Sequence, residues 1–332
     1  MATTRYFFQA SQEHFPPEDL LAQAVEAEQL GFDGIASSDH LQPWWEGGES
    51  GHTWPWLGAA GQATRTILLG TGVTTPGARY HPGMIAQAWA TLERLFPGRM
   101  FLGFGSGEAL NEVPVGDPWP SPAEQVARMD EALDIIDRLW RGETITRDDG
   151  YFTCKDLKLH TLPARRPPIW VSAFGPEAAK VAARRGDGFW TLADPERVPD
   201  LLEVYRAECD DAGKLPGEIV LHTGFSWAAD EDAALEAVRK WKGAQPDDVY
   251  REDIHIPANV YAHGEETTSD QDMKEGFVVG ADPAEHVERI REIAALGATI
   301  VVLQNNSGAD PHGAIRVYGE HVLPALRGAR VA

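Results

Sequence analysis

Residues 66–105 read TILLGTGVTTPGARYHPGMIAQAWATLERLFPGRMFLGFG, and this stretch decides the fold. It opens on the apolar run TILLGTGVTT, continues through a helical segment from Met84 to Leu95, and turns at Pro97-Gly98 into a second apolar run from Met100 to Gly105. A strand, a helix and a strand in this order predict two parallel neighbours, because parallel strands need a long crossover connection.

The same unit repeats in both directions along the chain. Toward the N-terminus, apolar runs at 4–10 and 32–40 flank a helix that begins at Pro17 and ends at Gly31. Toward the C-terminus, predicted strands at 167–174, 187–193, 218–228 and 298–305 alternate with amphipathic segments. Eight such strands predict an α/β fold, a (β/α)8 TIM barrel that forms a single domain over residues 1–332. The alternative is an open, doubly wound sheet.

Two segments interrupt the alternation. Residues 245–273 are polar, contain Pro246 and Pro257 and show no clear period. We interpret them as an insertion after the seventh strand, on the C-terminal rim where barrel enzymes build their sites. Residues 140–168 include ETITRDDGYFTC, which predicts a small hairpin around Asp149-Gly150.

Charge and composition narrow the possible partners. The 332 residues include 51 acidic and 29 basic side chains, a formal net charge of -22. This balance argues against nucleic acid and anionic membranes, which both require a basic surface. No apolar run reaches the roughly 18 residues of a membrane span, and the first residues do not resemble a secretory signal. With only Cys154 and Cys209 present, we expect a cytoplasmic protein without a disulfide framework.

Polar side chains follow four of the predicted strands. These are Glu13 after the first, Asp39, His40 and Trp44 after the second, Thr74 and Thr75 after the third, and Glu108, Asn111 and Glu112 after the fourth. Because parallel strands end at one rim, we expect these side chains to converge. Histidine ordinarily titrates near neutral pH, so His40 is the candidate general base. The structural alternatives are a loop histidine at position 40, a helix cap at Asp39 and rim packing at Trp44.

Two further loops carry features of a binding site. FLGFGSGEALNE supplies Gly103, Gly105 and Gly107 directly after a strand, but its GxGxG spacing differs from the dinucleotide fingerprint GxGxxG. We interpret these glycines as positions where backbone approaches a flat cofactor or a bulge. The loop Ser172-Ala173-Phe174-Gly175-Pro176 leads into a helix, whose N-terminus offers free N–H groups to a phosphate. No His or Cys spacing typical of a metal site occurs, so we predict none.

At these residues the sequence resembles the luciferase-like superfamily of flavin and deazaflavin barrels, and most of all its coenzyme F420-dependent oxidoreductases, which include the glucose-6-phosphate dehydrogenases. The matching stretches span roughly residues 5 to 190 and return near the C-terminus. They are FFQASQEHF, SSDHLQPWW, LLGTGVTTPGARYHPGMIAQAWATL, FLGFGSGEALNE, RLWRGE, GDGFW and FVVGADPAEHVERI.

The resemblance implies a coenzyme F420 site at the barrel mouth, with FMN as the alternative cofactor. It implies a cis peptide at Gly72-Val73 behind the deazaflavin ring, and it places Ser172 to Pro176 near the phosphate-bearing tail. The other cofactor contacts that it implies are Asp39, Thr75, Glu108 and Asn111. It further implies that His40 removes the hydroxyl proton, that Trp44 flanks the reacting centre, that Glu108 handles the proton of the reduced ring, and that Glu13 completes the pocket. The implied assembly is a homodimer.

One departure from the family bears on the substrate. Sugar-phosphate members hold the phosphate with basic residues, whereas the corresponding positions here are Asp194 or Pro195, Val249 or Tyr250, and Gly276. An unpaired dianion in an acidic protein is costly. We therefore expect a hydride transfer from a non-phosphorylated sugar or alcohol to the deazaflavin. The alternatives are a sugar-phosphate dehydrogenase, because Arg197, Arg251 and Lys274 lie close by in sequence, and an FMN-dependent luciferase-like monooxygenase.

Overall fold

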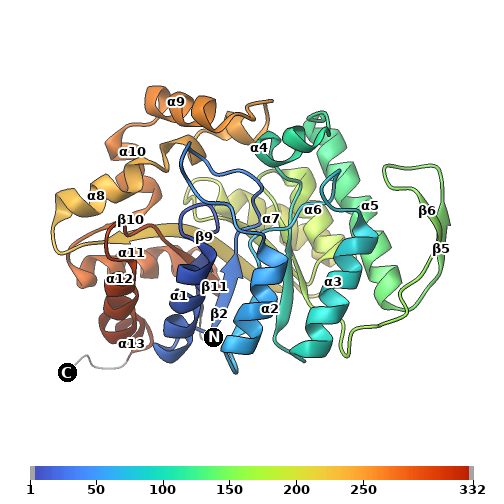
Figure 1. Ribbon diagram of the computed structural model, residues 1–332, viewed down its shortest axis with the longest axis horizontal. Helices are drawn as coiled ribbons and strands as arrows, with labels where there is room; N and C mark the ends of the chain where they lie inside the picture. Colours follow the sequence, from blue (N-terminus) through green and yellow to red (C-terminus); the bar gives the residue numbers. More distant parts are fainter. Residues whose placement is uncertain (1–3, 329–332) are drawn as a thin grey trace.

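Eight parallel strands close into a barrel in the computed structural model, which describes residues 4–328 (Figure 1). The barrel strands are β1 (Arg5–Ala10), β2 (Gly34–Ser37), β3 (Leu68–Thr71), β4 (Met100–Phe104), β7 (Ile169–Ser172), β8 (Gly188–Leu192), β9 (Glu218–Trp227) and β11 (Ile300–Asn305). They follow one another around the barrel in chain order, and β11 closes the ring between β9 and β1. The predicted TIM barrel is therefore confirmed, and the open sheet is excluded.

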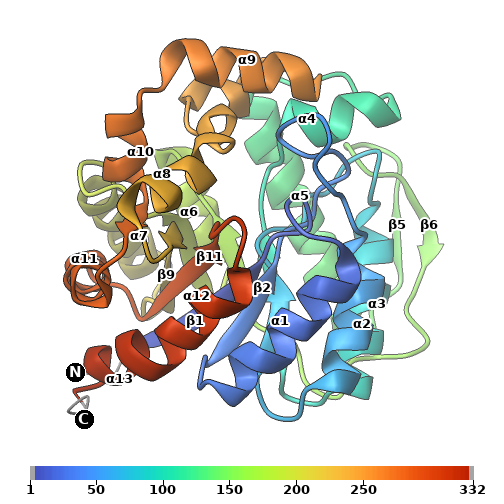
Figure 2. The same cartoon turned by 60° about the vertical axis from the view of Figure 1, so that its left-hand side comes forward.

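Helices between the strands form an outer ring, which is visible in the turned view of Figure 2. The ring consists of α1 (Pro17–Gln29), α2 (Thr53–Ala63), α3 (Pro82–Leu95), α5 (Pro122–Trp140), α6 (Pro176–Arg185), α7 (Val198–Asp211), α11 (Pro283–Ala295), α12 (Pro311–Val317) and α13 (Leu323–Leu326). Many of them begin at a proline, which suits the first helical turn because its N–H groups have no helical partner. Among residues 4–328, no helix is long and apolar enough to cross a membrane.

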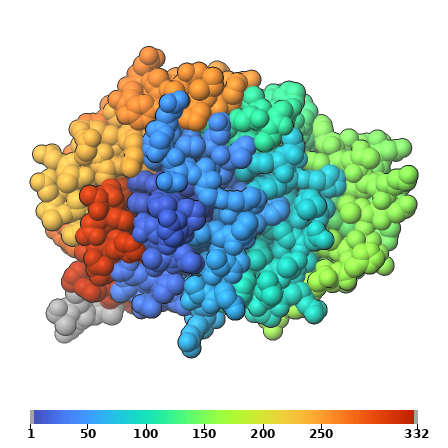
Figure 3. Space-filling view, in the orientation of Figure 1, coloured from blue at the N-terminus to red at the C-terminus, as the bar shows by residue number. Residues whose placement is uncertain are grey.

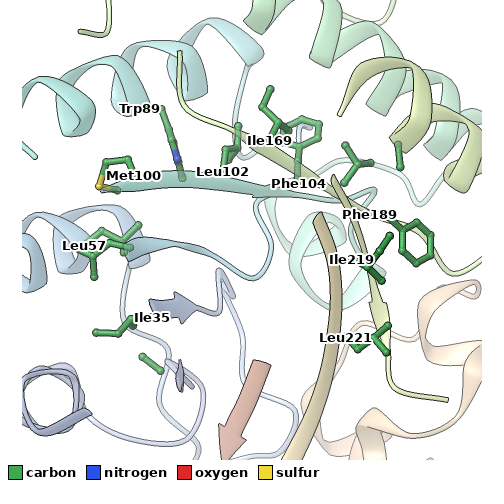
Figure 4. Packing of buried hydrophobic residues seen from close by; sticks show 14 of the residues in the cluster. Ile35, Leu57, Trp89, Met100, Leu102, Phe104, Ile169, Phe189, Ile219 and Leu221 are labelled. Carbon is green, nitrogen blue, oxygen red and sulfur yellow. The ribbon is translucent and has the colours of Figure 1, made fainter. Parts of the chain in front are cut away.

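The core has two layers because successive strand residues point to opposite faces of the sheet. Outward-facing residues such as Leu102 and Ile169 pack against the helices, as Figure 4 shows for part of this layer. Inward-facing residues, among them Phe7, Phe101 and Trp170, fill the barrel itself. The rings of Phe101 and Trp170 stack with centroids 4.3 Å apart. The barrel is thus packed below its mouth, and a ligand has room only at the ends of the strands.

The segment after β9 is more regular than its sequence indicates. After α8 (Glu231–Arg239), it contains α9 (Pro257–Thr267) and α10 (Asp270–Gly276), so much of 245–273 is helical although its sequence shows no clear period. Their apolar residues, among them Val260 and Met273, pack with Trp44 and Leu110 in a small cluster apart from the main core, which explains why no long apolar face is visible in the sequence. The prediction also missed β10 (Val278–Gly280), which pairs with the end of β9.

The hairpin expected around Asp149-Gly150 is present as β5 (Ile145–Arg147) and β6 (Cys154–Leu157), which pair antiparallel on the outside of the barrel. The helices of residues 245–273 lie across the C-terminal ends of the strands, beside α4 (Ala109–Glu112) (Figure 2). In the space-filling view of Figure 3 they run along the upper edge, next to the loop that follows β2.

Candidate active site

His40 lies at the barrel mouth between two carboxylates. Its Nε2 is 3.3 Å from Oε1 of Glu108 and 4.0 Å from Oε1 of Glu13, and its side chain is only 12% exposed. On the other side of the ring, Nδ1 lies 3.3 Å from the carbonyl oxygen of Gln42. Nδ1 also lies 3.3 Å from the side-chain amide nitrogen of Asn111, which can only donate, and the carboxylates at Nε2 can only accept, so both ring nitrogens have polar partners.

The two acids are themselves held in place by neighbouring polar groups. Ser38 donates a hydrogen bond to Glu13, and the side-chain amide of Asn111 donates to Glu108. The carbonyl of the Asn111 side chain accepts from the backbone N–H of Leu41 at 2.7 Å, which fixes the orientation of the amide. The loops after β1, β2 and β4 therefore position one another around the imidazole.

Asp39 faces away from His40 into a buried network. Its Oδ2 accepts from Thr74 at 2.6 Å, and its Oδ1 lies 3.3 Å from Arg79 and 3.1 Å from the hydroxyl of Tyr80. Burial and the adjacent carboxylate raise the pKa of Tyr80, which keeps this phenol neutral. In this structure the Asp39 carboxylate thus joins the loop after β2 to the loop after β3.

Arg79 also holds a second buried carboxylate. Its guanidinium lies 3.2 Å from Oε1 of Glu112, while Oε2 of Glu112 has no hydrogen-bond partner. Burial raises the pKa of Glu112 to about 7, because desolvation outweighs the attraction of Arg79. We call Glu13, Asp39, His40, Arg79, Glu108, Asn111 and Glu112 the polar flank of the mouth.

The backbone between β3 and α3 contains the expected cis peptide at Gly72-Val73. Gly103 permits this bulge, since a Cβ on Gly103 would lie 1.9 Å from the carbonyl oxygen of Thr71. A Cβ on Gly105 would likewise lie 2.6 Å from the side chain of Val73, so these glycines leave room for the bulge. Val73 is half-buried at the mouth, and Thr75 is buried against Gly107, whose φ is +84°.

The loop Ser172 to Pro176 follows β7, the strand next to β4, and leads into α6. No side chain caps the N-terminus of this helix, and a Cβ on Gly175 would touch nothing within 4 Å. The first N–H groups of α6 therefore face open space, as a phosphate site requires. Ala173 is buried, whereas Phe174 is 39% exposed.

A third group of residues supplies aromatic rings. Trp44 is buried, and its ring centroid lies 5.2 Å from that of His40. Tyr250, from a turn of 3-10 helix at Asp247–Tyr250, lies 5.9 Å from Trp44 and 5.3 Å from Phe174. We call Trp44, Phe174 and Tyr250 the aromatic flank.

Comparison with known proteins identifies the family. The model of the luciferase-like monooxygenase family matches residues 2–299. The F420-dependent glucose-6-phosphate dehydrogenase of Microbacterium testaceum is 39% identical over 97% of both chains. This chain belongs to the luciferase-like monooxygenase family.

The names of other similar proteins give different substrates. The F420-dependent hydroxymycolic acid dehydrogenase of Mycobacterium tuberculosis is 39% identical over 96% of this chain and 87% of its own. A solved structure of an F420-dependent secondary alcohol dehydrogenase in complex with an F420-acetone adduct has a TM-score of 0.94 and 33% identity. That structure covers 98% of this chain, which in turn covers 99% of the solved chain. Similarity to all three is continuous, so it includes residues 200–275, where the sequence resemblance looked weak.

The structure brings together most of the residues predicted for this luciferase-like site. Glu13, Glu108 and Asn111 all contact His40, Trp44 adjoins His40, and the loop 172–176 follows the strand next to β4. Sequence reasoning missed Arg79, Ser38, Gln42 and Tyr250. The stretch around Arg79 was matched to the family, but nothing in its spacing indicates that the side chain turns back to Asp39. Among residues 4–328 no cluster of His, Cys, Asp or Glu is arranged to hold a metal ion.

Proposed function

We propose that this protein is a coenzyme F420-dependent dehydrogenase that oxidises a hydroxyl-bearing carbon of a non-phosphorylated alcohol or sugar. The observation that carries this proposal is the environment of His40. Its Nε2 faces two carboxylates within 4.0 Å at the mouth of the barrel. Relatives with 33–39% identity that bear the names of F420-dependent dehydrogenases support the same cofactor and reaction class.

In this proposal His40 is the general base. It takes the hydroxyl proton on Nε2 while the carbinol C–H bond breaks and a C=O bond forms, so the substrate becomes a ketone or a lactone. Glu108 and Glu13 stabilise the positive charge that develops on the imidazole. The carbonyl of Gln42 and the side-chain amide of Asn111 both contact Nδ1 and so hold the ring in place. Trp44 excludes water beside the reacting centre.

The residues present fit a deazaflavin that carries a phosphate tail. Gly72, Val73 and Thr75 would back its ring, and the uncapped N-terminus of α6, with Ser172 to Pro176 around it, would hold the phosphate. Asn111, Glu108 and Asp39 complete the set proposed for the cofactor. When bound, the deazaflavin supplies a two-electron acceptor for the hydride from carbon.

The charges around the mouth favour a substrate without phosphate. Arg197 binds Asp247 with both terminal nitrogens, at 2.7 and 2.5 Å, and Arg251 lies 3.8 Å from the same carboxylate. Lys242 lies 3.2 Å from Asp270. These cations are already paired with carboxylates, so a phosphate dianion would have to compete for them.

Two alternatives remain for the substrate and the cofactor. The 39% identity to glucose-6-phosphate dehydrogenases favours a sugar phosphate, and the family name favours an FMN-dependent monooxygenase. Purified protein should be titrated with F420 and with FMN by fluorescence, and then assayed for bleaching of F420 absorbance with alcohols, glucose and glucose 6-phosphate. We expect F420 binding and turnover of uncharged substrates. Binding of FMN alone, or turnover of glucose 6-phosphate alone, would contradict the proposal.

The expected homodimer is also a proposal. Light scattering coupled to size-exclusion chromatography tests it, and a mass of one chain at micromolar concentration would exclude it.

A further inference from the structure

A continuous chain of rings runs along one side of the mouth, from His40 to the loop after β7. Successive centroids are 5.2 Å apart for His40 and Trp44, 5.9 Å for Trp44 and Tyr250, and 5.3 Å for Tyr250 and Phe174. The last two pairs meet nearly edge to face, at 65° and 75°, a favourable geometry for aromatic rings. Tyr250 is the member of this chain that the insertion supplies.

Tyr250 presents only an apolar ring to the mouth. Its hydroxyl donates a hydrogen bond to the carbonyl oxygen of Ala244 at 2.8 Å, so its one polar atom is used inside the insertion. Burial raises the pKa of Tyr250, and the carboxylates of Glu108, Asp247 and Glu13 add to this effect, so the phenol stays neutral. A substrate hydroxyl placed against this ring would find no hydrogen-bond partner.

Other large apolar side chains in the loops after the strands are exposed as well. Leu192, at the end of β8, and Phe174 are each 39% exposed. Leu41 and Ile256 are 41% and 46% exposed, and their loops adjoin because the side chain of Gln42 donates to the carbonyl of His255 at 3.0 Å. Large apolar side chains that stay exposed around a mouth are typical of a ligand-binding surface.

We propose that Tyr250 determines substrate specificity: its ring packs against the apolar substituent of an aliphatic secondary alcohol whose hydroxyl lies at His40. Sugars are disfavoured because their hydroxyls would be buried against the ring without partners. This inference rests on the proposed function and narrows its substrate class. A substituent that is buried against the ring gains about three- to fourfold in affinity per methylene group.

A series of 2-alkanols from 2-propanol to 2-hexanol tests this role, with glucose and cyclohexanol as comparisons. For wild type and Tyr250→Phe we expect KM to fall about threefold per methylene. For Tyr250→Ala we expect the decrease to shrink to less than about 1.5-fold. The matched control is Tyr261→Ala in α9 of the same insertion, which should retain the wild-type dependence. An unchanged dependence in Tyr250→Ala, or a wild-type preference for glucose, would overturn the inference.

Binding separates a failure of this inference from a failure of the proposed function. If the wild type oxidises no alcohol, the proposed function fails. The packing of an alkyl chain against Tyr250 is then tested by titrating the F420-loaded protein with 2-hexanol and following cofactor fluorescence. A Kd for 2-hexanol at least about fivefold weaker in Tyr250→Ala, but unchanged in Tyr250→Phe, supports packing of the alkyl chain against this ring. An equal Kd in all three proteins refutes it. Circular dichroism and F420 affinity establish that each variant is folded.

Discussion

The two sides of the barrel mouth are built in different ways. The polar flank consists of loops after β1 to β4, and its charged groups are nearly all buried: Asp39, Arg79 and Glu112 are 1%, 8% and 4% exposed. The aromatic flank depends on the insertion, whose ion pairs lie outside. Arg197 and Asp247 are 49% and 43% exposed. The charged groups of the polar flank are thus buried, whereas this ion pair beside the aromatic flank is exposed.

This difference assigns separate tasks to the two flanks. A buried charge is costly unless several partners hold it, so the polar flank tolerates little change in geometry. Ring contacts are less directional and tolerate changes in shape. In the proposed enzyme the polar flank would therefore carry the proton chemistry, and the aromatic flank would adapt to the substrate.

Replacing His40 by Ala should give the largest effect, because it removes the proposed base from the polar flank. We expect kcat to fall by about 10²- to 10⁴-fold, with F420 affinity within about threefold of wild type by fluorescence titration. The matched control is His255→Ala on the insertion, which should retain activity. Turnover retained in His40→Ala would remove this residue as the base.

Arg79→Met tests whether the polar flank is held together by its one arginine. The variant leaves Asp39 and Glu112 buried without their shared cation, and breaking such a network costs about 3–5 kcal/mol. Urea denaturation should show this loss in the free energy of unfolding. A loss below about 1 kcal/mol would mean that the network relaxes to admit water.

Glu112→Gln tests the buried carboxyl by pH. Its folded-state pKa is raised to about 7, above the ordinary value, so the native state holds a proton that the unfolded state releases. The wild type should therefore lose stability as pH rises from about 4.5 to 7. Thermal melts of Glu112→Gln should show a weaker decline over this window. Parallel curves for the two proteins would contradict the assigned burial effect.

Arg197→Met, which removes the ion pair to Asp247 in the turn that carries Tyr250, should have the smallest effect. The same substitution that is severe at position 79 should cost about 0–1 kcal/mol here, because the pair with Asp247 is half exposed and screened by solvent. Urea denaturation again measures it. The proposed contrast between the flanks would collapse if Arg79→Met and Arg197→Met were equally destabilising.

Local patterns predicted much of this molecule. Alternating apolar runs and amphipathic segments indicated the barrel. Because parallel strands end at one rim, the sequence also predicted that Glu13, His40 and Glu108 lie close together. The roles of these residues stay predictions. The helices of 245–273 were not predicted, because their apolar residues face only a small cluster that includes Val260 and Met273. Each helix therefore has a narrow apolar stripe.

The sequence by itself determined the barrel and the rim on which the reactive side chains gather, because both follow from the period of the chain and from right-handed crossovers. Only the tertiary structure decided which side chains at the mouth are already paired with one another. That Arg79 turns back to Asp39 and Glu112, that Arg197 binds Asp247 fifty residues away, and that Tyr250 reaches Trp44 all depend on how loops distant in sequence pack at the mouth. Such contacts are set by packing, and no local pattern encodes them.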